Sequence, residues 1–417
     1  MRMRVARYGL CLVLAACGTS ASTTSQQNGG SAAKSSDRPF TATPVTNFKA
    51  PWAMSFLPGS TTALVTKKRG QLLLVDVATG EKHPVAGAPA VVAEGQGGLL
   101  DVVVSPRFAR DGQVYLTFSE ASKEGGTGLA LARGRLVRSG GMARLENVTT
   151  IWHNPSGGQG GHYGARIAFA PDGNSLFLSA GERQRFLPAQ DSDQPLGKIL
   201  HLTLDGKPAG GNPFAGRTGA ATVNVIDPPE NSHVAVNAAR RPVRWPGPNL
   251  TPAETYSSGH RNPLGIAFAP DGRLWEAEMG PKGGDELNLI LPGRNYGWPR
   301  ASNGSNYDGT DIPDHKSGDR FEAPKLYWNP SISPAGLLIY TGSLFPQWKG
   351  DAFIPALSGQ ALIHVRIRGD RASKADQWDM GARIRAVQQG PSGEIYLLED
   401  GANARLLRLT PAAQTRR

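Results

Sequence analysis

The chain has 417 residues, of which 52 are Gly and 32 are Pro, and only 19% are charged. This composition favours many turns and short strands over long helices, and the length allows either several domains or one large all-β domain. The formal net charge is +11, but the Lys and Arg residues are scattered, with 67–69 and 240–241 as the largest runs. We therefore expect a solvated basic surface and no nucleic-acid partner.

The first 16 residues resemble an export signal. Three arginines precede a short apolar run, which ends in Leu14-Ala15-Ala16-Cys17. Small residues followed by Cys are typical of a lipobox, where the thiol is acylated and the peptide is cut before Cys17. The apolar run is too short to span a membrane. We predict a lipoprotein signal peptide over 1–16 and a periplasmic lipoprotein; an ordinary signal peptide is the alternative.

A flexible tether is expected over 17–45, because the segment after Cys17 is rich in Ser, Thr, Gln and Gly. Gly18 stands where a retention Asp would favour the inner membrane, so the outer membrane is preferred as the anchoring site. Cys11 and Cys17 are the only cysteines. The mature chain would keep only the lipidated one, which excludes an internal disulfide, a cysteine zinc site and an attached haem.

An apolar strand, a Pro or Gly turn and a second apolar strand recur six times in the rest of the chain. The first strands of these units are expected at 52–57, 102–104, 167–170, 266–269, 336–340 and 387–389. Repeats longer than about 40 residues that contain such hairpins are typical of β-propellers. We predict an all-β fold, a six-bladed β-propeller over 46–413 with long loops on the active-site face. A pair of β-sandwiches is the alternative.

The connection over 212–256 is unusually long for a compact domain. Loops of this length are usually functional or disordered. We interpret it as a partly ordered lid beside the site, with an inert insertion as the alternative.

Two loops precede near-copies of one strand pattern. The first contains Gly161-His162-Tyr163-Gly164, and the second is Gly259-His260-Arg261-Asn262-Pro263. Glycine beside His162 frees the backbone for unusual dihedral angles. An imidazole can accept a proton near neutral pH, as abstraction from an alcohol requires, although a lone His is more often structural. His162 is therefore a candidate general base.

The stretches 278–288 and 293–299 combine carboxylates with Gly-rich turns. Turn carbonyls and carboxylates clustered in this way suit Ca²⁺, which binds six to eight oxygens. The alternating acidic spacing of an EF-hand is absent. Acidic turns that face water are the alternative interpretation.

Together with Gly95-Gln96-Gly97-Gly98, Ala189-Gln190-Asp191 and Arg383-Ile384-Arg385, these motifs resemble the soluble quinoprotein sugar dehydrogenases. The resemblance is to the aldose sugar dehydrogenase branch, whose members use pyrroloquinoline quinone (PQQ) and Ca²⁺. It covers about residues 47 to 411 and implies a six-bladed propeller, in agreement with the count of repeats.

The resemblance also implies roles for individual residues. His162 would take the proton from the anomeric hydroxyl as hydride passes to PQQ, and Arg261 would stabilise charge on the reducing cofactor. The further PQQ-binding residues would be Gln96, Asn262, Tyr307, Arg383 and Arg385. The carbonyls of Gly280 and Pro281 would hold the catalytic Ca²⁺, and Glu286 with the Tyr296 carbonyl would hold a second, structural one.

The chain departs from the family pattern at one charged position. Family members carry Lys after a Leu near the cofactor, whereas here Leu357 is followed by Ser358. One charge contact to PQQ is therefore lost, or a lysine from elsewhere replaces it.

We therefore predict PQQ- and calcium-dependent oxidation of the C1 hydroxyl of aldose sugars to lactones. Electrons would pass to an external acceptor, a quinone or a redox protein, because no haem domain is attached. One alternative is a calcium-dependent lactonase or another hydrolase, although hydrolysis does not need the arginines that suit a polycarboxylate cofactor. A non-catalytic sugar-binding lipoprotein is the other, in which Ser358 would mark decay of the site.

Overall fold

The computed structural model describes residues 38–123, 125–158, 160–226 and 239–413. These residues form 28 strands, with only two helices of four residues each, α1 (Phe108–Asp111) and α2 (Thr251–Glu254), and short 3₁₀ turns. The all-β prediction is confirmed. None of the helices in this part of the chain is long and apolar enough to cross a membrane. The predicted signal peptide and Cys17 lie outside the described residues.

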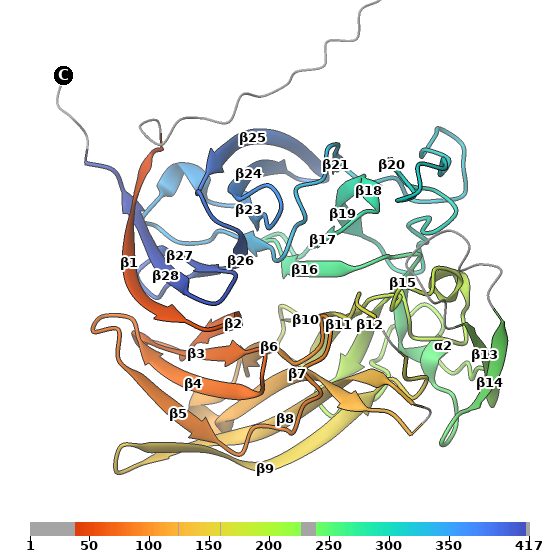
Figure 1. Cartoon of the computed structure of the whole chain (residues 1–417), viewed down its shortest axis with the longest axis horizontal. Helices are drawn as coiled ribbons and strands as arrows, with labels where there is room; N and C mark the ends of the chain where they lie inside the picture. The colour runs from red at the N-terminus through yellow and green to blue at the C-terminus, as the bar shows by residue number, and fades with distance from the viewer. Residues whose placement is uncertain (1–37, 124, 159, 227–238, 414–417) are drawn as a thin grey trace, which may run out of the picture. The chain divides into compact units, whose positions relative to one another are not determined.

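The two ends of the described chain meet in one sheet. Strand β1 (Phe40–Phe48) pairs with β28 (Ala404–Pro411), followed by β27 (Ile395–Glu399) and β26 (Ile384–Gln389). Figure 1 shows the red β1 running beside the blue β28. The tether predicted to extend to residue 45 is therefore too long, because residues 40–44 already pair in this sheet.

An eight-stranded sheet contains two antiparallel four-stranded meanders. The first consists of β2 (Pro51–Phe56), β3 (Thr62–Lys67), β4 (Gln71–Asp76) and β5 (Lys82–Ala86). The second consists of β6 (Leu99–Val104), β7 (Gln113–Ala121), β8 (Thr127–Ser139) and β9 (Met142–His153). Their outer strands β5 and β9 join them through a short parallel pairing, which makes one sheet of two repeats.

Three further four-stranded sheets follow along the chain. The first contains β10 (Gly164–Phe169), β11 (Ser175–Ala180), β12 (Lys198–Thr203) and β15 (Thr255–Ser258). The next contains β16 (Pro263–Phe268), β17 (Leu274–Glu278), β19 (Asp285–Ile290) and β21 (Leu326–Trp328). The last contains β22 (Leu338–Ile339), β23 (Ala352–Pro355), β24 (Ala361–Arg368) and β25 (Arg371–Asp379).

The remaining strands form two-stranded sheets: β13 (Thr222–Ile226) with β14 (Arg240–Arg244), and β18 (Lys282–Gly283) with β20 (Gly304–Ser305). The first pair lies in the long connection over 212–256, which therefore contains regular structure. Residues 227–238 between these strands lie outside the described part. The role of this connection as a lid stays a prediction.

The six first strands expected from the sequence correspond to β2, β6, β10, β16, β22 and β26. Each of these strands contacts the next, and β26 contacts β2. Apolar side chains of neighbouring meanders fill the space between the sheets: Leu64 and Leu100 belong to one buried cluster, and Ala277 and Ile354 to another. The loops that precede these first strands therefore come close to one another.

A buried ion pair ties the first strands together. Arg166 on β10 donates to Asp101 on β6 at 2.9 Å and to the carbonyl oxygens of Leu264 and Ala335, which belong to two other meanders. The guanidinium also lies over the ring of Trp52, with its carbon 4.1 Å from the ring centroid. A buried charge is tolerated only when it is paired and hydrogen-bonded. This arrangement therefore holds the first strands in place beneath the loops that precede them.

Candidate active site

His162 lies in the loop before β10 and is held by a buried carboxylate. Its Nδ1 contacts the Glu182 carboxylate, whose other oxygen accepts the backbone N–H of Phe186 at 2.6 Å. Gly164 pairs with Ala180, so continuing this antiparallel register places His162 opposite Glu182. His162 has a φ of 52°, in the left-handed region that non-Gly residues seldom occupy. The side chain is thus fixed rather than free to rotate.

The protonation state of His162 follows from its surroundings. Burial and the nearby charge of Arg261 lower the pKa of His162 from 6.5 to about 4, and Glu182 opposes this shift. Burial raises the pKa of Glu182, but His162 and Arg261 outweigh it and hold that pKa below its ordinary value. A neutral imidazole beside an ionised carboxylate carries its proton on Nδ1. Nε2 of His162 is then the free acceptor that a general base needs.

Gln96, predicted to bind the cofactor, lies beside this imidazole. Its Oε1 accepts the backbone N–H of His162 at 2.8 Å. A Cβ at position 161 would lie 2.3 Å from the side-chain amide carbon of Gln96, so any larger residue there would displace the Gln96 side chain. The Gln96 loop and the His162 loop are therefore packed in direct contact.

Arg261 and Asn262 extend the site from the equivalent loop before β16. The Arg261 guanidinium donates from Nη1 to the carbonyls of Gly280 at 2.6 Å and Met279 at 3.2 Å, and from Nη2 to the Tyr307 hydroxyl at 3.3 Å. Tyr307 is 54% exposed. Asn262 Oδ1 accepts the backbone N–H of Gly164 at 3.1 Å. Since the Arg261 carbonyl also accepts the N–H of Glu182 at 2.9 Å, the two loops form one unit.

A cavity of about 420 Å³ opens next to these loops. Its walls combine aromatic and aliphatic side chains with polar groups and cations: Trp52, Tyr163, Leu264, Met279, Leu357, Gln96, Ser333, Lys68, Arg383, Arg385 and Asp400. Three cations against one carboxylate favour an anionic ligand, and the flat apolar walls favour a planar one.

The two predicted arginine ligands share one anchor. Arg383 Nε lies 3.0 Å from one oxygen of Asp400, and Arg385 Nη2 lies 3.2 Å from the other. Burial lowers the pKa of Arg385, and Asp400 opposes this effect. Both arginines thus point into the cavity from one face of the chain at β26, as their alternate spacing predicts. Asp400 holds them in place before any ligand binds.

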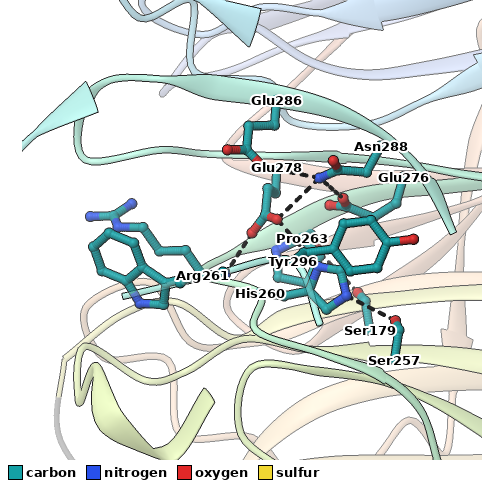
Figure 2. Close-up of polar contacts among 12 residues, drawn as sticks. Ser179, Ser257, His260, Arg261, Pro263, Glu276, Glu278, Glu286, Asn288 and Tyr296 are labelled. Carbon is teal, nitrogen blue, oxygen red and sulfur yellow. Dashed lines mark hydrogen bonds and ion pairs between the residues drawn. The ribbon is translucent and has the colours of Figure 1, made fainter. Parts of the chain in front are cut away.

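A second cluster of buried carboxylates lies behind Arg261 (Figure 2). Asn288 Nδ2 donates to Glu276 at 3.1 Å, to Glu278 at 3.3 Å and to Glu286 at 3.1 Å. His260 Nδ1 lies 3.2 Å from Glu278, whose other oxygen accepts the N–H of Arg261 at 2.6 Å. Figure 2 shows these side chains converging from β17, β19 and the His260 loop. Glu278 therefore connects the cluster to the Arg261 backbone.

The cluster has the composition of a cation site. Glu276 Oε1 and Asn288 Oδ1 are buried without a hydrogen-bond partner among the described residues. Burial, and then repulsion from Glu278, raise the pKa of both Glu276 and Glu286 well above the ordinary value. A void of about 10 Å³, room for one small ion or water, is lined by Glu278, Glu286 and Tyr296 among others. Oxygen-rich, negatively charged surroundings suit a hard divalent cation.

The first predicted calcium position differs in detail from the expectation. The Gly280 carbonyl accepts a hydrogen bond from Arg261, while the Gly280 N–H donates to Asp285 at 2.9 Å. Pro281 beside it is buried. A cation on the Gly280 and Pro281 carbonyls would therefore require the Arg261 guanidinium to move, because like charges repel at this distance.

Sequence reasoning missed several residues that the structure brings into the site. Glu182, Asp400, Lys68 and Glu276 have no motif of their own, and His260 was noted only as a neighbour of Arg261. The strand register could have revealed Glu182. Gly164 pairs with Ala180, so the residue two positions before Gly164 lies opposite the residue two positions after Ala180. No local pattern indicates that Asp400 joins Arg383 and Arg385.

The geometry can be compared with known proteins. A family model described as Glucose / Sorbosone dehydrogenase matches residues 48–225 and 246–408. The aldose sugar dehydrogenase YliI of Escherichia coli (strain K12) is 36% identical over 367 residues, which are 87% of this chain and 90% of the relative. The chain therefore belongs to the glucose/sorbosone dehydrogenase family, and the predicted resemblance and class of enzyme, a sugar oxidoreductase, are confirmed.

Solved structures agree. The apo-form of the soluble E. coli aldose sugar dehydrogenase has a TM-score of 0.77 and 34% identity, covering 89% of this chain and all of that chain. The PQQ-bound aldose sugar dehydrogenase of Streptomyces coelicolor has a TM-score of 0.68 and 27% identity, covering 89% of this chain and 98% of that chain. Similarity over nearly the whole described chain means that the fold, and not one motif, is shared.

Proposed function

We propose that this protein oxidises the C1 hydroxyl of aldose sugars to lactones with PQQ and Ca²⁺. The observation that carries this proposal is a neutral, buried His162 whose Nδ1 is occupied by Glu182 and whose Nε2 is free, next to a cavity lined by three cations. The relatives named as sugar dehydrogenases and the PQQ-bound structure of one of them support the same conclusion.

The residues of the cavity fit the cofactor. PQQ is a planar tricycle with three carboxylates, and the cavity offers flat apolar walls at Trp52 and Leu264 with Arg383, Arg385 and Lys68 on one side. Forked guanidinium groups bind carboxylates with two hydrogen bonds. Gln96, at the cavity wall, and Asn262 and Tyr307, which belong to the Arg261 side of the site, would supply polar groups beside the reactive end. When bound, PQQ supplies the carbonyl carbon that accepts hydride from C1 of the sugar.

The residues of the chain divide the remaining work. His162 Nε2 accepts the proton of the C1 hydroxyl, so that the C1–O bond becomes a carbonyl as the hydride leaves. Glu182 holds the imidazole in the productive tautomer and stabilises the positive charge that develops on it. Arg261 would supply a positive charge near the developing negative charge, where burial strengthens the interaction.

Calcium has two proposed positions. The carbonyls of Gly280 and Pro281 would hold the catalytic ion once the Arg261 guanidinium has moved off the Gly280 carbonyl, and the ion would polarise a cofactor carbonyl as a Lewis acid. Glu286 and the Tyr296 carbonyl would hold a structural ion, and the unpartnered buried oxygen of Glu276 supports a cation in this region. Calcium removal by a chelator is therefore expected to abolish activity and lower the melting temperature.

The architecture proposed is a six-bladed β-propeller. It is supported by the six four-stranded meanders, by the contacts from each first strand to the next, and by the pairing of β1 with β28, which closes the ring as the first and last strands of propellers commonly do. We also propose a periplasmic lipoprotein anchored through Cys17, which passes electrons to an external acceptor. Loss of labelling by a radioactive fatty acid in Cys17→Ala tests the anchor.

One assay separates the proposal from its alternatives. Purified apoprotein is supplied with Ca²⁺, PQQ, glucose and an electron-accepting dye, alone and in combination. Dye reduction that requires both additions and is lost in His162→Gln is the expected result. Turnover of a lactone without PQQ would instead support a hydrolase, and no turnover with a broad panel of sugars would support a binding protein.

A further inference from the structure

Lys68 is fixed at the wall of the cavity by its own backbone. It follows β3, and its N–H donates to the Ala50 carbonyl at 2.9 Å, while its carbonyl accepts the N–H of Leu99 at 3.1 Å. A Cβ at Gly98 would lie 2.1 Å from the Lys68 carbonyl oxygen, so that contact tolerates only glycine. Because both the N–H and the carbonyl of Lys68 are hydrogen-bonded, the first part of its side chain has little conformational freedom.

The side chain of Lys68 extends along the cavity wall toward the Gln96 loop. Its Nζ donates to the carbonyl of Gly95, the residue before Gln96, which binds the backbone of His162. Burial, and then the charge of Arg385, lower the pKa of Lys68, and Asp400 opposes the shift. Lys68 therefore lies close enough to Arg385 and Asp400 for their charges to act on its ammonium group.

The charges of this wall are not balanced. Asp400 uses one oxygen for Arg383 and the other for Arg385. Among the described residues, the one hydrogen bond of Lys68 Nζ is to a carbonyl, not to a carboxylate. A cation held at a cavity wall without its own counter-ion is prepared for an anionic ligand.

Position 358 cannot supply such a charge. Ser358 Oγ lies 2.7 Å from Ser333 Oγ and donates to the Ser331 carbonyl at 3.2 Å. Its neighbours Leu357 and Ser333 line the cavity. Ser358 therefore completes a small neutral network at the rim, on a different element from Lys68.

We propose that Lys68 binds a carboxylate of the cofactor as the third cation of a clamp with Arg383 and Arg385, and so replaces the charge that Ser358 does not provide. This inference rests on the proposed function. It concerns a binding residue, because Lys68 contacts the cofactor and not the hydroxyl being oxidised.

The test is the affinity of the apoprotein for PQQ in the presence of Ca²⁺, measured by isothermal titration calorimetry over a series of NaCl concentrations. Loss of one charge-assisted contact corresponds to a Kd about tenfold weaker in Lys68→Gln. The salt dependence of Kd is also expected to become shallower, because one ion pair fewer is screened. Lys68→Arg is expected to retain most of the affinity, and so is Ser358→Lys combined with Lys68→Gln.

Lys67→Gln is the matched control. Lys67 is the preceding residue and donates to the Gln71 side chain, and it does not line the cavity. Its substitution is expected to leave both Kd and the salt dependence unchanged, with melting temperatures of all variants close to the parent.

The outcomes separate the two proposals. A Lys68→Gln protein that binds PQQ like the parent at every salt concentration overturns the role of Lys68 and leaves the proposed function intact. Weaker binding with an unchanged salt dependence overturns it too, because a structural defect would act in that way. A parent protein that does not bind PQQ at all overturns the proposed function itself.

Discussion

His162 and His260 are two versions of one arrangement in successive sheets. Each follows a glycine, each precedes the first strand of its meander, and each directs Nδ1 toward a glutamate from the second strand or just beyond it. The hairpins β10–β11 and β16–β17 even share a register irregularity near their first residues. A repeated scaffold thus repeats the His–Glu contact.

The second ring nitrogen distinguishes the two histidines. His260 is fully buried, its Nε2 contacts Ser257 Oγ at 2.8 Å, and its ring stacks on Tyr296 with centroids 4.7 Å apart. His162 has no such partner for Nε2 among the described residues, and it lies beside the cavity. The same His–Glu pair therefore has both ring nitrogens occupied in one repeat, and in the other it leaves Nε2 of His162 without a partner among the described residues.

The largest expected effect is from His162→Gln. Loss of a general base is expected to reduce kcat by about 10²- to 10⁴-fold while the melting temperature stays near the parent. His260→Gln should do the reverse: a loss of about 1–3 kcal/mol of unfolding free energy, because buried partners are left unpaired, with a smaller change in kcat. Steady-state kinetics and urea unfolding measure both. Equal losses of kcat in the two variants would refute the distinction between them.

Glu182→Gln is expected to have the next largest effect. The glutamine side chain has only one oxygen that can accept a hydrogen bond, and it carries no charge to balance a protonated His162. We therefore expect kcat to fall about 10²-fold or more. Glu120→Gln is the matched control, because Glu120 contacts the exposed His153 at 3.5 Å and does not line the cavity. PQQ affinity should be unchanged in both. A Glu182→Gln enzyme with full kcat would show that Glu182 does not position His162.

A titration tests the protonation state directly. With a pKa lowered to about 4, His162 in the apoprotein should stay neutral on acidification past 6.5 and gain its proton only near pH 4. Because Glu182 raises this pKa, Glu182→Gln should shift the midpoint to still lower pH. NMR of histidine-labelled apoprotein follows the shift, and His162→Gln identifies the signal. A midpoint at or above 6.5 would contradict the buried, charge-opposed environment.

The smallest expected effect concerns Glu276 in the cluster around His260. Its folded pKa is raised above 4.5, so the ionised side chain destabilises the fold increasingly as pH rises. The amide in Glu276→Gln cannot ionise. In the presence of a chelator, this variant should be as stable as the parent or up to about 1 kcal/mol more stable, and the difference should grow with pH. Added Ca²⁺ should then stabilise the parent more than the variant. Equal calcium-induced shifts in melting temperature would separate Glu276 from the cation site.

Local sequence was sufficient for some parts of the site. The glycines around His162 and the repeated strand pattern made that histidine a candidate, and the alternate spacing of Arg383 and Arg385 predicted that both side chains share one face. The Gly280 carbonyl was selected as well, but its contact with Arg261 was not foreseen. That contact depends on a guanidinium from a loop nineteen residues earlier in the chain.

The sequence by itself determined the strands and their repetition, because alternating apolar residues and turn glycines act over a few neighbouring positions. The resemblance to the family rested on its motifs and not on this periodicity. Only the tertiary structure decided which charges meet: Glu182 with His162 through strand register, Asp400 with two arginines, and Lys68 with the same cavity from the opposite end of the chain. These contacts join residues that are distant in sequence, and the balance between burial and charge that sets their protonation exists only once the sheets have packed.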